Sequence, residues 1–320
     1  MDILLTGSVA YDYLMTFPGH FKEHLLPEHL EKISLSFLVE SLVRRRGGIA
    51  PNIAYTLALL GAKPRVFATV GQDFEEYRAW LDTQGVDTTL MKVVPDKYTA
   101  SYFATTDRSN AQVASFYPGA MEDAGSLSLH DVKDNPPDMV MVSPNDPAAM
   151  DQYIRECKEI GLKYIYDPSQ QIIRVDGATI KRGLEGATAL FVNEYEFELI
   201  KDKTGMSADE VLAHLDFMVI TLGPKGADVY TADGKLYIDA VPTDNIVDPT
   251  GGGDAFRGGF LTGYRLGLDW EVCGRLGNLA ATYCLENEGP QDHGFTRQQF
   301  VARYREHYDD NGALDALMDQ

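Results

Sequence analysis

The sequence predicts an α/β protein, a three-layer αβα sandwich whose mostly parallel sheet carries a small second β-sheet. Three observations support this fold class. Strand-sized apolar runs alternate with amphipathic stretches along most of the 320 residues, which is typical of a parallel sheet covered by helices on both faces. A Gly, Pro, Asn or Asp closely follows each apolar run, as expected where strands end. Two segments depart from this alternation of strands and helices and indicate an inserted sheet.

Six apolar runs are expected to form strands of the main sheet. In chain order they are Ile3 to Leu5, Pro64 to Val70, Met139 to Val142, Lys163 to Tyr166, Ala189 to Val192 and Phe217 to Thr221. Ligands of such sheets bind at the carboxyl ends of the strands. The polar turns after these runs are therefore where we expect a binding site.

Helices are expected between the strands. Residues 51–60 place Ile53, Leu57 and Leu60 on one stripe, the spacing of a helix with one buried face, and residues 146–160 and 208–215 repeat it. Two further segments, residues 12–46 and about 96–118, alternate polar and apolar side chains instead. From them we expect a small antiparallel sheet, acting as a lid or, equally well by pattern, as a structural or dimer-forming sheet.

The composition limits the partners of the chain. Lys and Arg number 28 against 48 Asp and Glu, a formal net charge of −20. A chain this acidic is repelled by phosphate backbones and anionic membranes, and its one tight basic run, Arg44 to Arg46, is too short to reverse that field. We therefore expect no nucleic acid and no membrane as partner.

Cysteine usage and the first residues indicate a cytoplasmic protein. The three cysteines are odd in number and form no CxxC pair, which argues against a disulfide framework and a structural zinc site. The start has none of the features of a secretory signal. No stretch approaches the ~20 apolar residues of a membrane helix.

The most informative segment is residues 248–260, DPTGGGDAFRGGF. Three glycines, Gly251 to Gly253, precede Asp254 and an amphipathic run, which predicts a flexible turn feeding a helix N-terminus that is ready for an anion. Asp254 is then either a helix cap or a base that takes a proton from a hydroxyl while the glycine N–H groups hold a transferring phosphoryl group. Spacing alone favours neither. The chain has no Walker, HExxH, GxSxG or protein-kinase motif.

This segment resembles the second signature of the PfkB, or ribokinase-like, carbohydrate kinases. Three further motifs of that family follow its order: Gly47-Gly48 with Asn52, Asn193-x-x-Glu196, and residues 221–226, TLGPKG. The chain is identified as a member of this family. The resemblance implies a ribokinase-like fold in one domain over residues 1–320, with the lid inserted from about residues 12–46 and 96–118.

Within the family, four segments resemble the bacterial adenosine kinases of the actinobacterial type. They are Thr6-Gly7-Ser8 with Asp12, residues 34–39, residues 116–121 and residues 167–171. The resemblance implies a kinase that uses ATP and Mg²⁺ to phosphorylate the ribose 5′-hydroxyl of adenosine by in-line transfer, giving AMP for purine salvage.

The resemblance also implies residue roles. Asp254 is the expected base, and Gly251, Gly252 and Gly253 form the anion hole. The expected substrate-binding residues are Ser8, Asp12, Gly48, Asn52, Tyr102, Phe103, Phe116, Gln170, Gln171 and Arg174, with Tyr102 and Phe103 as alternatives for the aromatic ring of the lid. ATP is expected at Asn193, Thr221, Gly223, Gly226 and Asn278. Glu196 is expected to hold Mg²⁺ through water, and Asp248 and Thr250 to form a monovalent-cation loop for K⁺.

Three alternatives stay open. The first is a sugar or sugar-phosphate kinase of the same fold, with Arg44 to Arg46 meeting a substrate phosphate. The second is a nucleoside kinase of broad specificity, and the third is a non-catalytic nucleotide-binding protein, against which the presence of Asp254 argues. Exposed lid edges predict a homodimer through the lid, because unpaired strands find partners.

Overall fold

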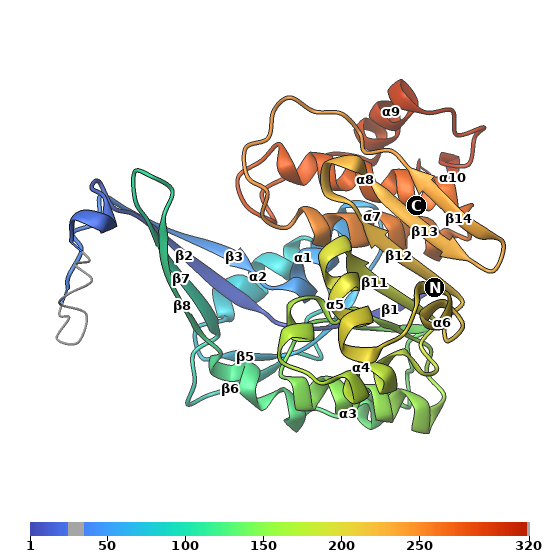
Figure 1. Ribbon diagram of the computed structural model, residues 1–320, viewed down its shortest axis with the longest axis horizontal. Helices are drawn as coiled ribbons and strands as arrows, with labels where there is room; N and C mark the ends of the chain where they lie inside the picture. Colours follow the sequence, from blue (N-terminus) through green and yellow to red (C-terminus); the bar gives the residue numbers. More distant parts are fainter. Residues whose placement is uncertain (25–34, 319–320) are drawn as a thin grey trace.

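An eight-stranded sheet forms the centre of the protein, whose computed structural model describes residues 1–24 and 35–318 (Figure 1). Its strands are β1 Ile3–Thr6, β4 Arg65–Phe67, β9 Met139–Val142, β10 Tyr164–Tyr166, β11 Ala189–Asn193, β12 Phe217–Thr221, β13 Ala227–Thr231 and β14 Gly234–Ile238. The order is β14-β13-β12-β11-β10-β9-β1-β4. Pairing is parallel from β4 to β12, and β13 and β14 add an antiparallel hairpin at one edge.

Helices cover both faces of this sheet (Figure 1). They are α1 Ile49–Leu59, α2 Glu75–Thr83, α3 Pro147–Ile160, α4 Gly177–Leu184, α5 Glu194–Thr204, α6 Ala208–Leu212, α7 Gly252–Leu266, α8 Trp270–Leu285, α9 Arg297–His307 and α10 Asp315–Met318. Short 3-10 turns occur at Phe21–Glu23, Gly119–Ser126, Leu129–Val132, Ser169–Ile173 and Gly223–Lys225. No described helix has the length and apolar composition to cross a bilayer.

Two hydrophobic cores flank the sheet because successive strand residues point to opposite faces. Leu4 and Leu190 pack on the side of α3, α4, α5 and α6. Leu5 and Phe191, the next residues in the same strands, pack on the side of α1 and α7. The predicted three-layer αβα sandwich with a mostly parallel sheet is confirmed.

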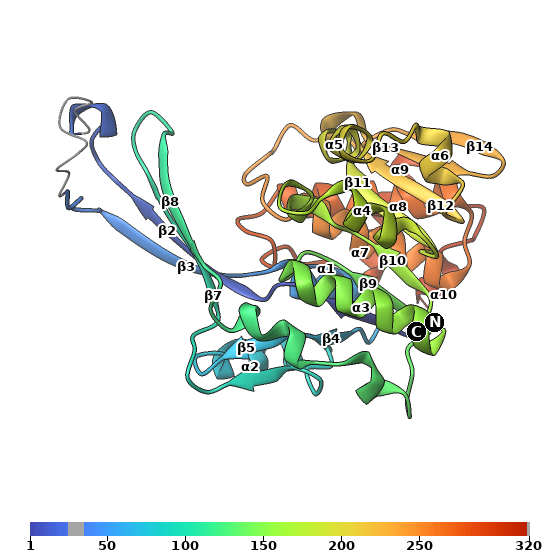
Figure 2. The same cartoon turned by 60° about the horizontal axis from the view of Figure 1, so that its bottom comes forward.

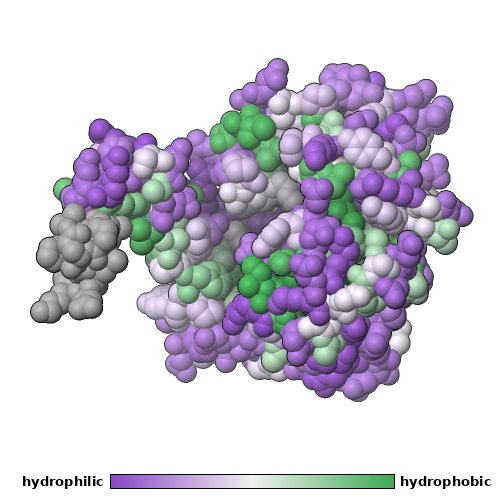
Figure 3. Space-filling model, in the orientation of Figure 1, coloured by the Kyte–Doolittle hydropathy of each residue, from purple (hydrophilic) through white to green (hydrophobic). Residues whose placement is uncertain are grey.

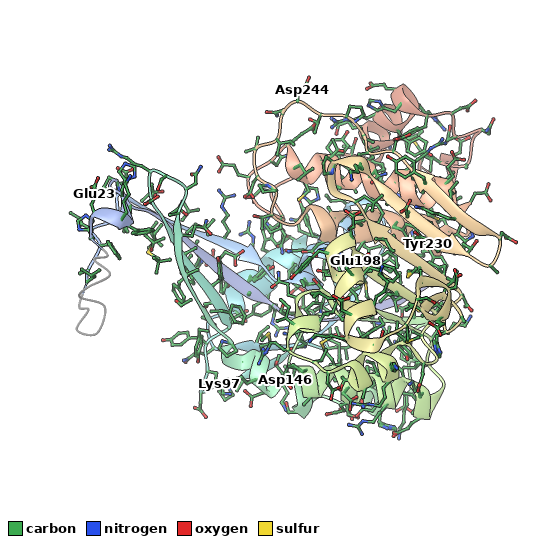
Figure 4. The ribbon with its side chains drawn as sticks, in the orientation of Figure 1. Glu23, Lys97, Asp146, Glu198, Tyr230 and Asp244 are labelled. Atoms are coloured by element: carbon green, nitrogen blue, oxygen red, sulfur yellow. The ribbon has the colours of Figure 1, made fainter. Side chains whose placement is uncertain are left out.

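The lid is a four-stranded sheet that projects from the body (Figures 1 and 2). Its order is β3-β2-β7-β8, with β2 Ala10–Thr16, β3 Ser41–Gly47, β7 Ala100–Thr106 and β8 Gln112–Tyr117. The expectation of a purely antiparallel lid is wrong, because β2 and β7 both leave the body and run outward side by side in parallel, while β3 and β8 return. Glu23 marks the distal end of the lid (Figure 4). Residues 25–34, and with them Ser34 of the resemblance, lie outside the described residues.

The predicted strand over residues 64–70 is two strands in two sheets. After β4 the chain turns away, and β5 Thr69–Gly71 pairs with β6 Lys92–Val94 in a separate two-stranded sheet. Hydrogen bonds fix the departure: Thr69 Oγ1 donates to the carbonyl of Ala120 (2.6 Å), and the Gly71 N–H donates to Thr99 Oγ1 (3.0 Å).

Two helix boundaries also differ from the prediction. Helix α1 begins at Ile49, two residues earlier than predicted, where the Ile49 N–H donates to Ser8 Oγ (3.3 Å). Helix α6 ends at Leu212, three residues earlier than predicted.

Candidate active site

A cavity of about 570 Å³ lies where the lid meets the carboxyl ends of β1, β9 and β10. Figure 3 shows the surface hollowed between the lid and the body. This volume is in the range of small-molecule sites. The predicted residues that line it are Ser8, Asp12, Gly48, Asn52, Tyr102, Phe116, Gln170, Gln171, Arg174, Asp248 and Thr250. Residues far apart in the sequence are therefore brought together as expected.

Asp12 lines the cavity from the lid strand β2. It pairs in register with Arg45 of β3, and burial raises the pKa of its carboxyl to about 6, with the Asp248 carboxylate adding to the rise and Arg45 opposing it. Gly48 follows at the junction of β3 and α1 with φ +97°, where a Cβ would lie 2.5 Å from the Ser8 carbonyl oxygen. Only glycine fits there, so Gly48 lets the backbone turn beside Asp12.

Asp254 stands in the first turn of α7 and is connected to the cavity wall through Asn52. Asn52 of α1, which lines the cavity, donates from Nδ2 to Asp254 Oδ2 (2.8 Å). Burial raises the pKa of the Asp254 carboxyl to about 6, although the Arg257 charge and the Asn52 hydrogen bond oppose the rise. A carboxylate poised near neutral pH is suited to accept a proton from a hydroxyl group.

The three glycines before Asp254 begin α7. Gly251 is the N-cap residue with φ +81°, and a Cβ there would lie 2.3 Å from Pro290 Cβ. The first N–H groups of a helix have no intrahelical acceptor and carry the positive end of its dipole. This 15-residue helix therefore presents backbone donors to an anion beside Asp254.

A buried arginine fixes this helix start. Arg257 holds Asp167 in a two-pronged ion pair, with Nε–Oδ2 2.8 Å and Nη2–Oδ1 2.7 Å, and its Nη1 donates to the carbonyl of Gly253 (3.0 Å). Both charged side chains are buried. Planar two-pronged pairs restrict orientation strongly, so the glycine turn is anchored to the end of β10.

The cavity also carries an aromatic wall and amides. Tyr102 of β7 and Phe116 of β8 are cross-strand partners on the face toward the cavity, and Gln170 and Gln171 come from the turn after β10. The Oε1 atom of Gln171 is buried and has no hydrogen-bond partner in the described part of the chain.

Of the two aromatic alternatives, the structure brings only Tyr102 to the cavity. Neighbouring strand residues point to opposite faces, and Phe103 accordingly stacks on Tyr13 with ring centroids 4.8 Å apart. Phe103 is not among the residues that line the cavity.

The residues expected at ATP lie outside this cavity. Asn193 and Thr221 are register partners at the ends of β11 and β12, the same edge of the sheet that holds the cavity. Asn278 donates from Nδ2 to the Asp239 carbonyl (2.8 Å) and is buried, so it supports the chain after β14. Gly223 and Gly226 have φ +59° and +103°. They shape the turn between β12 and β13.

Asn193 and Glu196 form the capping box of α5. Asn193 Oδ1 accepts from the Glu196 N–H, and Glu196 Oε2 accepts from the Asn193 N–H, both at 2.8 Å. Glu196 Oε1 accepts from Ser169 Oγ (3.2 Å). Among the described residues no group of three or more His, Cys, Asp or Glu side chains is placed to hold a metal ion.

Asp248 and Thr250 lie in a tight loop on the cavity wall. Asp248 Oδ1 accepts from the Thr250 N–H (2.8 Å), and Oδ2 accepts from the Gly289 N–H (3.1 Å). Arg45 Nη1 lies 4.0 Å from Asp248 Oδ2, and Arg45 also pairs with Glu288 (2.9 Å). The loop is thus tied to the lid by an ion pair.

Sequence reasoning placed Arg45 at the site only in the sugar-kinase alternative, and it did not assign Arg257 or Gln291. Strand alternation is a signal that separates the three lid arginines: Arg45 shares the cavity face with Asp12, whereas Arg44 pairs with Glu76 and Arg46 stacks on Trp80. A lone Arg in the apolar stripe after Asp254 was a further signal. Gln291, which contacts Asn52, stands in no motif.

The comparisons with known proteins identify the family of this chain. Residues 6–295 match the pfkB family of carbohydrate kinases, nine-tenths of the chain. The chain belongs to this family. A nucleoside kinase of Methanocaldococcus jannaschii is 28% identical, over 95% of this chain and 97% of its own.

Solved structures give the same picture of this PfkB kinase. A nucleoside kinase of Burkholderia thailandensis in complex with inosine is 40% identical, covers 96% of this chain and 98% of its own, and has a TM-score of 0.84. An adenosine kinase from Sinorhizobium meliloti, 21% identical over 96% of this chain and 99% of its own with a TM-score of 0.70, shows the shared fold alone. The chain is therefore a phosphotransferase with ribokinase-like fold.

Proposed function

We propose that this kinase uses ATP to phosphorylate the ribose 5′-hydroxyl of purine nucleosides, with adenosine as a substrate that yields AMP for purine salvage. One observation carries the proposal: the cavity lined by Asn52, which is hydrogen-bonded to Asp254, is also lined by Phe116, Gln170 and Gln171. A hydroxyl acceptor beside a base and a flat aromatic wall with amides together match a nucleoside. The related Burkholderia thailandensis enzyme in complex with ADP-inosine supports this choice.

The ribose is assigned to Asp12, Gly48 and Asn52, which line the cavity. Vicinal ribose hydroxyls are hydrogen-bond donors, and an ionised carboxylate accepts two of them at once. With Asp12 holding these hydroxyls, the 5′-hydroxyl reaches Asp254, whose Oδ2 is occupied by Asn52 and whose Oδ1 accepts the proton.

The nucleoside base is assigned to the aromatic and amide side chains that line the cavity. Tyr102 and Phe116 offer their faces for stacking, and Arg174 lines the same cavity. The buried Oε1 of Gln171, which has no partner among the described residues, accepts an N–H from the purine. Adenosine offers its amino group and inosine its ring N–H. An amide therefore serves both, and a kinase accepting several purine nucleosides is the second candidate.

Phosphoryl transfer needs positioning and charge stabilisation more than covalent help from the protein. As the 5′-oxygen attacks the γ-phosphorus, its proton passes to Asp254 and the bond to the β-phosphate oxygen breaks, leaving ADP. The N–H groups of Gly251, Gly252 and Gly253 hold the charge of the transferring group. Closure of the lid excludes water as a competing acceptor.

ATP and Mg²⁺ fit the donors present. A long helix with a glycine-rich start is suited to a polyphosphate, and Asn193, Thr221, Gly223, Gly226 and Asn278 are assigned to the nucleotide side. Mg²⁺ would be held through the phosphates of ATP and through water, with Glu196 as the residue that would hold it through a water molecule. Bound there, the ion neutralises phosphate charge.

Acceptor assays test the proposal. With ATP and Mg²⁺, adenosine and inosine should give 5′-monophosphates, identified by the proton-coupled ³¹P signal of a CH₂–O–P group. Robust turnover of ribose or fructose with none of either nucleoside would establish the sugar-kinase alternative. Binding without any turnover would establish the non-catalytic one.

We further propose K⁺ activation through the loop of Asp248 and Thr250. Replacing K⁺ by tetramethylammonium at constant ionic strength should lower kcat. An unchanged kcat contradicts a cation site there.

We also propose a homodimer that joins two lids, working in the cytoplasm, where ATP is present and free thiols persist. Leu42, Val113 and Tyr117 expose 62%, 47% and 42% of their surface on the lid, and a second copy of this chain covers them. Light scattering should give twice the mass of the 35.4 kDa chain. A single-chain mass at micromolar concentration contradicts the dimer.

A further inference from the structure

Asn52 takes part in a chain of hydrogen bonds that the proposed chemistry does not yet explain. Its Oδ1 accepts from Gln291 Nε2 (2.6 Å), and the same nitrogen donates to the Tyr77 hydroxyl oxygen (2.6 Å). The Tyr77 hydroxyl in turn donates to the carbonyl of Gly47 (3.0 Å), at the end of lid strand β3. This series of hydrogen bonds therefore connects the junction between lid and body to Asp254.

These groups are shielded from water. Tyr77, Gln291 and Asn52 expose 1%, 3% and 6% of their surface. A buried hydrogen bond is strongly oriented, because water cannot replace a partner that turns away.

Each bond in the chain has one possible direction. A carbonyl oxygen only accepts, so the Tyr77 hydroxyl donates its hydrogen to the Gly47 carbonyl. Its oxygen must therefore accept from Gln291. Gln291 therefore turns its NH₂ end toward both Tyr77 and Asn52. Its Oε1 is accordingly buried without a partner among the described residues.

The orientation of the Gln291 amide also fixes how Asn52 faces Asp254. Because Oδ1 of Asn52 faces the NH₂ group of Gln291, its Nδ2 must face Asp254. If the Asn52 amide turned over, its oxygen would face the Asp254 carboxylate, and two acceptors would repel each other.

We propose that Gln291 and Tyr77 are positioning residues that fix the Asn52 amide so that it donates to Asp254, keeping the base ionised and directing its free oxygen to the acceptor hydroxyl. The inference rests on the proposed role of Asp254 as base. It deepens that role by naming side chains from α2 and from the loop after α8 that do not line the cavity.

The other groups that affect the pKa of Asp254 are not held in place by this series of hydrogen bonds. Arg257 of the same helix lowers the pKa of Asp254, Asp167 after β10 and Glu196 of α5 raise it, and the Cys284 thiol of α8 lies near the carboxyl. A substitution at Tyr77 or Gln291 leaves all four in place. A change in the titration of Asp254 then reports the lost donation from Asn52.

The test compares Tyr77→Phe and Gln291→Leu with Tyr55→Phe. Tyr55 is a matched control, because it is buried on α1 and its hydroxyl also donates to a backbone carbonyl, that of His293. Loss of the Asn52 donation should move the acidic limb of the kcat/KM profile to higher pH, by about half a unit or more, since that limb reports the free enzyme. We expect kcat to fall about 3- to 10-fold in Tyr77→Phe and about 10- to 100-fold in Gln291→Leu.

Tyr55→Phe should lower the melting temperature as Tyr77→Phe does, but leave the limb and kcat unchanged. Identical limbs and kcat values for all three variants would overturn the inference. If the wild type phosphorylates a sugar and no nucleoside, the proposed substrate is wrong. The same three variants are then compared with that sugar as acceptor, and the inference about Gln291 and Tyr77 is still tested. The pH dependence of urea unfolding gives the pKa shift of Asp254 without catalysis, and an equal pH dependence in Tyr77→Phe and the wild type also counts against the inference.

Discussion

Asp254→Asn should make the enzyme more stable and nearly inactive. The two side chains have the same shape, and the amide that replaces the carboxylate still offers an oxygen to Asn52 Nδ2, which lies 2.8 Å from Asp254 Oδ2 in the wild type. The substitution removes a buried negative charge that lowers the stability of the folded protein, because burial raises the pKa of Asp254 from 3.8 to about 6.

The sign and size follow from linkage. A carboxyl whose pKa is higher in the folded state destabilises the fold above that pKa, and the effect disappears as the pH falls below the unfolded value. The difference between about 6 and 3.8 corresponds to about 3 kcal/mol at pH 7. Since Asp254 is partly exposed to solvent, we expect a gain of about 1–3 kcal/mol, or roughly 2–6 °C in Tm for a chain of this size.

Kinetics and calorimetry decide between the outcomes. Loss of the base should lower kcat about 10²- to 10⁴-fold while isothermal titration still detects adenosine binding. Asp310→Asn is the matched control of opposite sign: Arg305 holds the pKa of Asp310 below its usual value, so this variant should lose stability and keep kcat. An Asp254→Asn enzyme with more than a tenth of wild-type kcat refutes the role of Asp254 as base. A variant that melts at a lower temperature than the wild type refutes the claim that the buried charge of Asp254 destabilises the fold.

Three other predictions concern binding, acid stability and thiols. Asp12→Asn should raise KM for the nucleoside about 10- to 100-fold with a smaller change in kcat, because an amide accepts from ribose hydroxyls more weakly than a carboxylate; an unchanged KM removes Asp12 from the ribose site. Burial lowers the pKa of His293 from 6.5 to about 4, so its neutral ring contributes stability that is lost as the pH falls from about 6.5 to 4. Urea titrations should therefore show the wild type losing about 2–3 kcal/mol more than His293→Gln between pH 7.5 and 4.5, and parallel losses would contradict this. Burial raises the pKa of Cys157, Cys273 and Cys284 to about 12, so a thiol reagent should titrate none of them in the native protein and all three in urea; rapid native labelling would show that a thiol is open.

Local patterns were sufficient for the elements of the body. Ile53, Leu57 and Leu60, the stripe expected on one helix face, are fully buried, and Phe217–Thr221 is the predicted strand. Patterns were insufficient where a distant partner decides. The run over residues 64–70 looks like one strand, but contacts with Thr99 and Ala120 divide it between two sheets.

The same limit applies to the site. The glycine turn before Asp254 has a local signature, so it was found in the sequence. The choice between Tyr102 and Phe103 needs the face of β7, which its pairing with β2 and β8 sets. Gln291 meets Asn52 from 239 residues away, and no spacing in the sequence records such a contact.

The central claim, that this PfkB kinase acts on purine nucleosides, is tested most directly by competition. Adenosine, inosine, ribose and fructose at equal concentrations compete for limiting ATP and Mg²⁺, and the ratio of phosphorylated products gives the ratio of kcat/KM values. We predict that adenosine and inosine 5′-monophosphates exceed the sugar phosphates at least about 100-fold, since a site built to pair with polar groups of the base rejects acceptors that lack them. A product pool dominated by ribose or fructose phosphate would contradict the account.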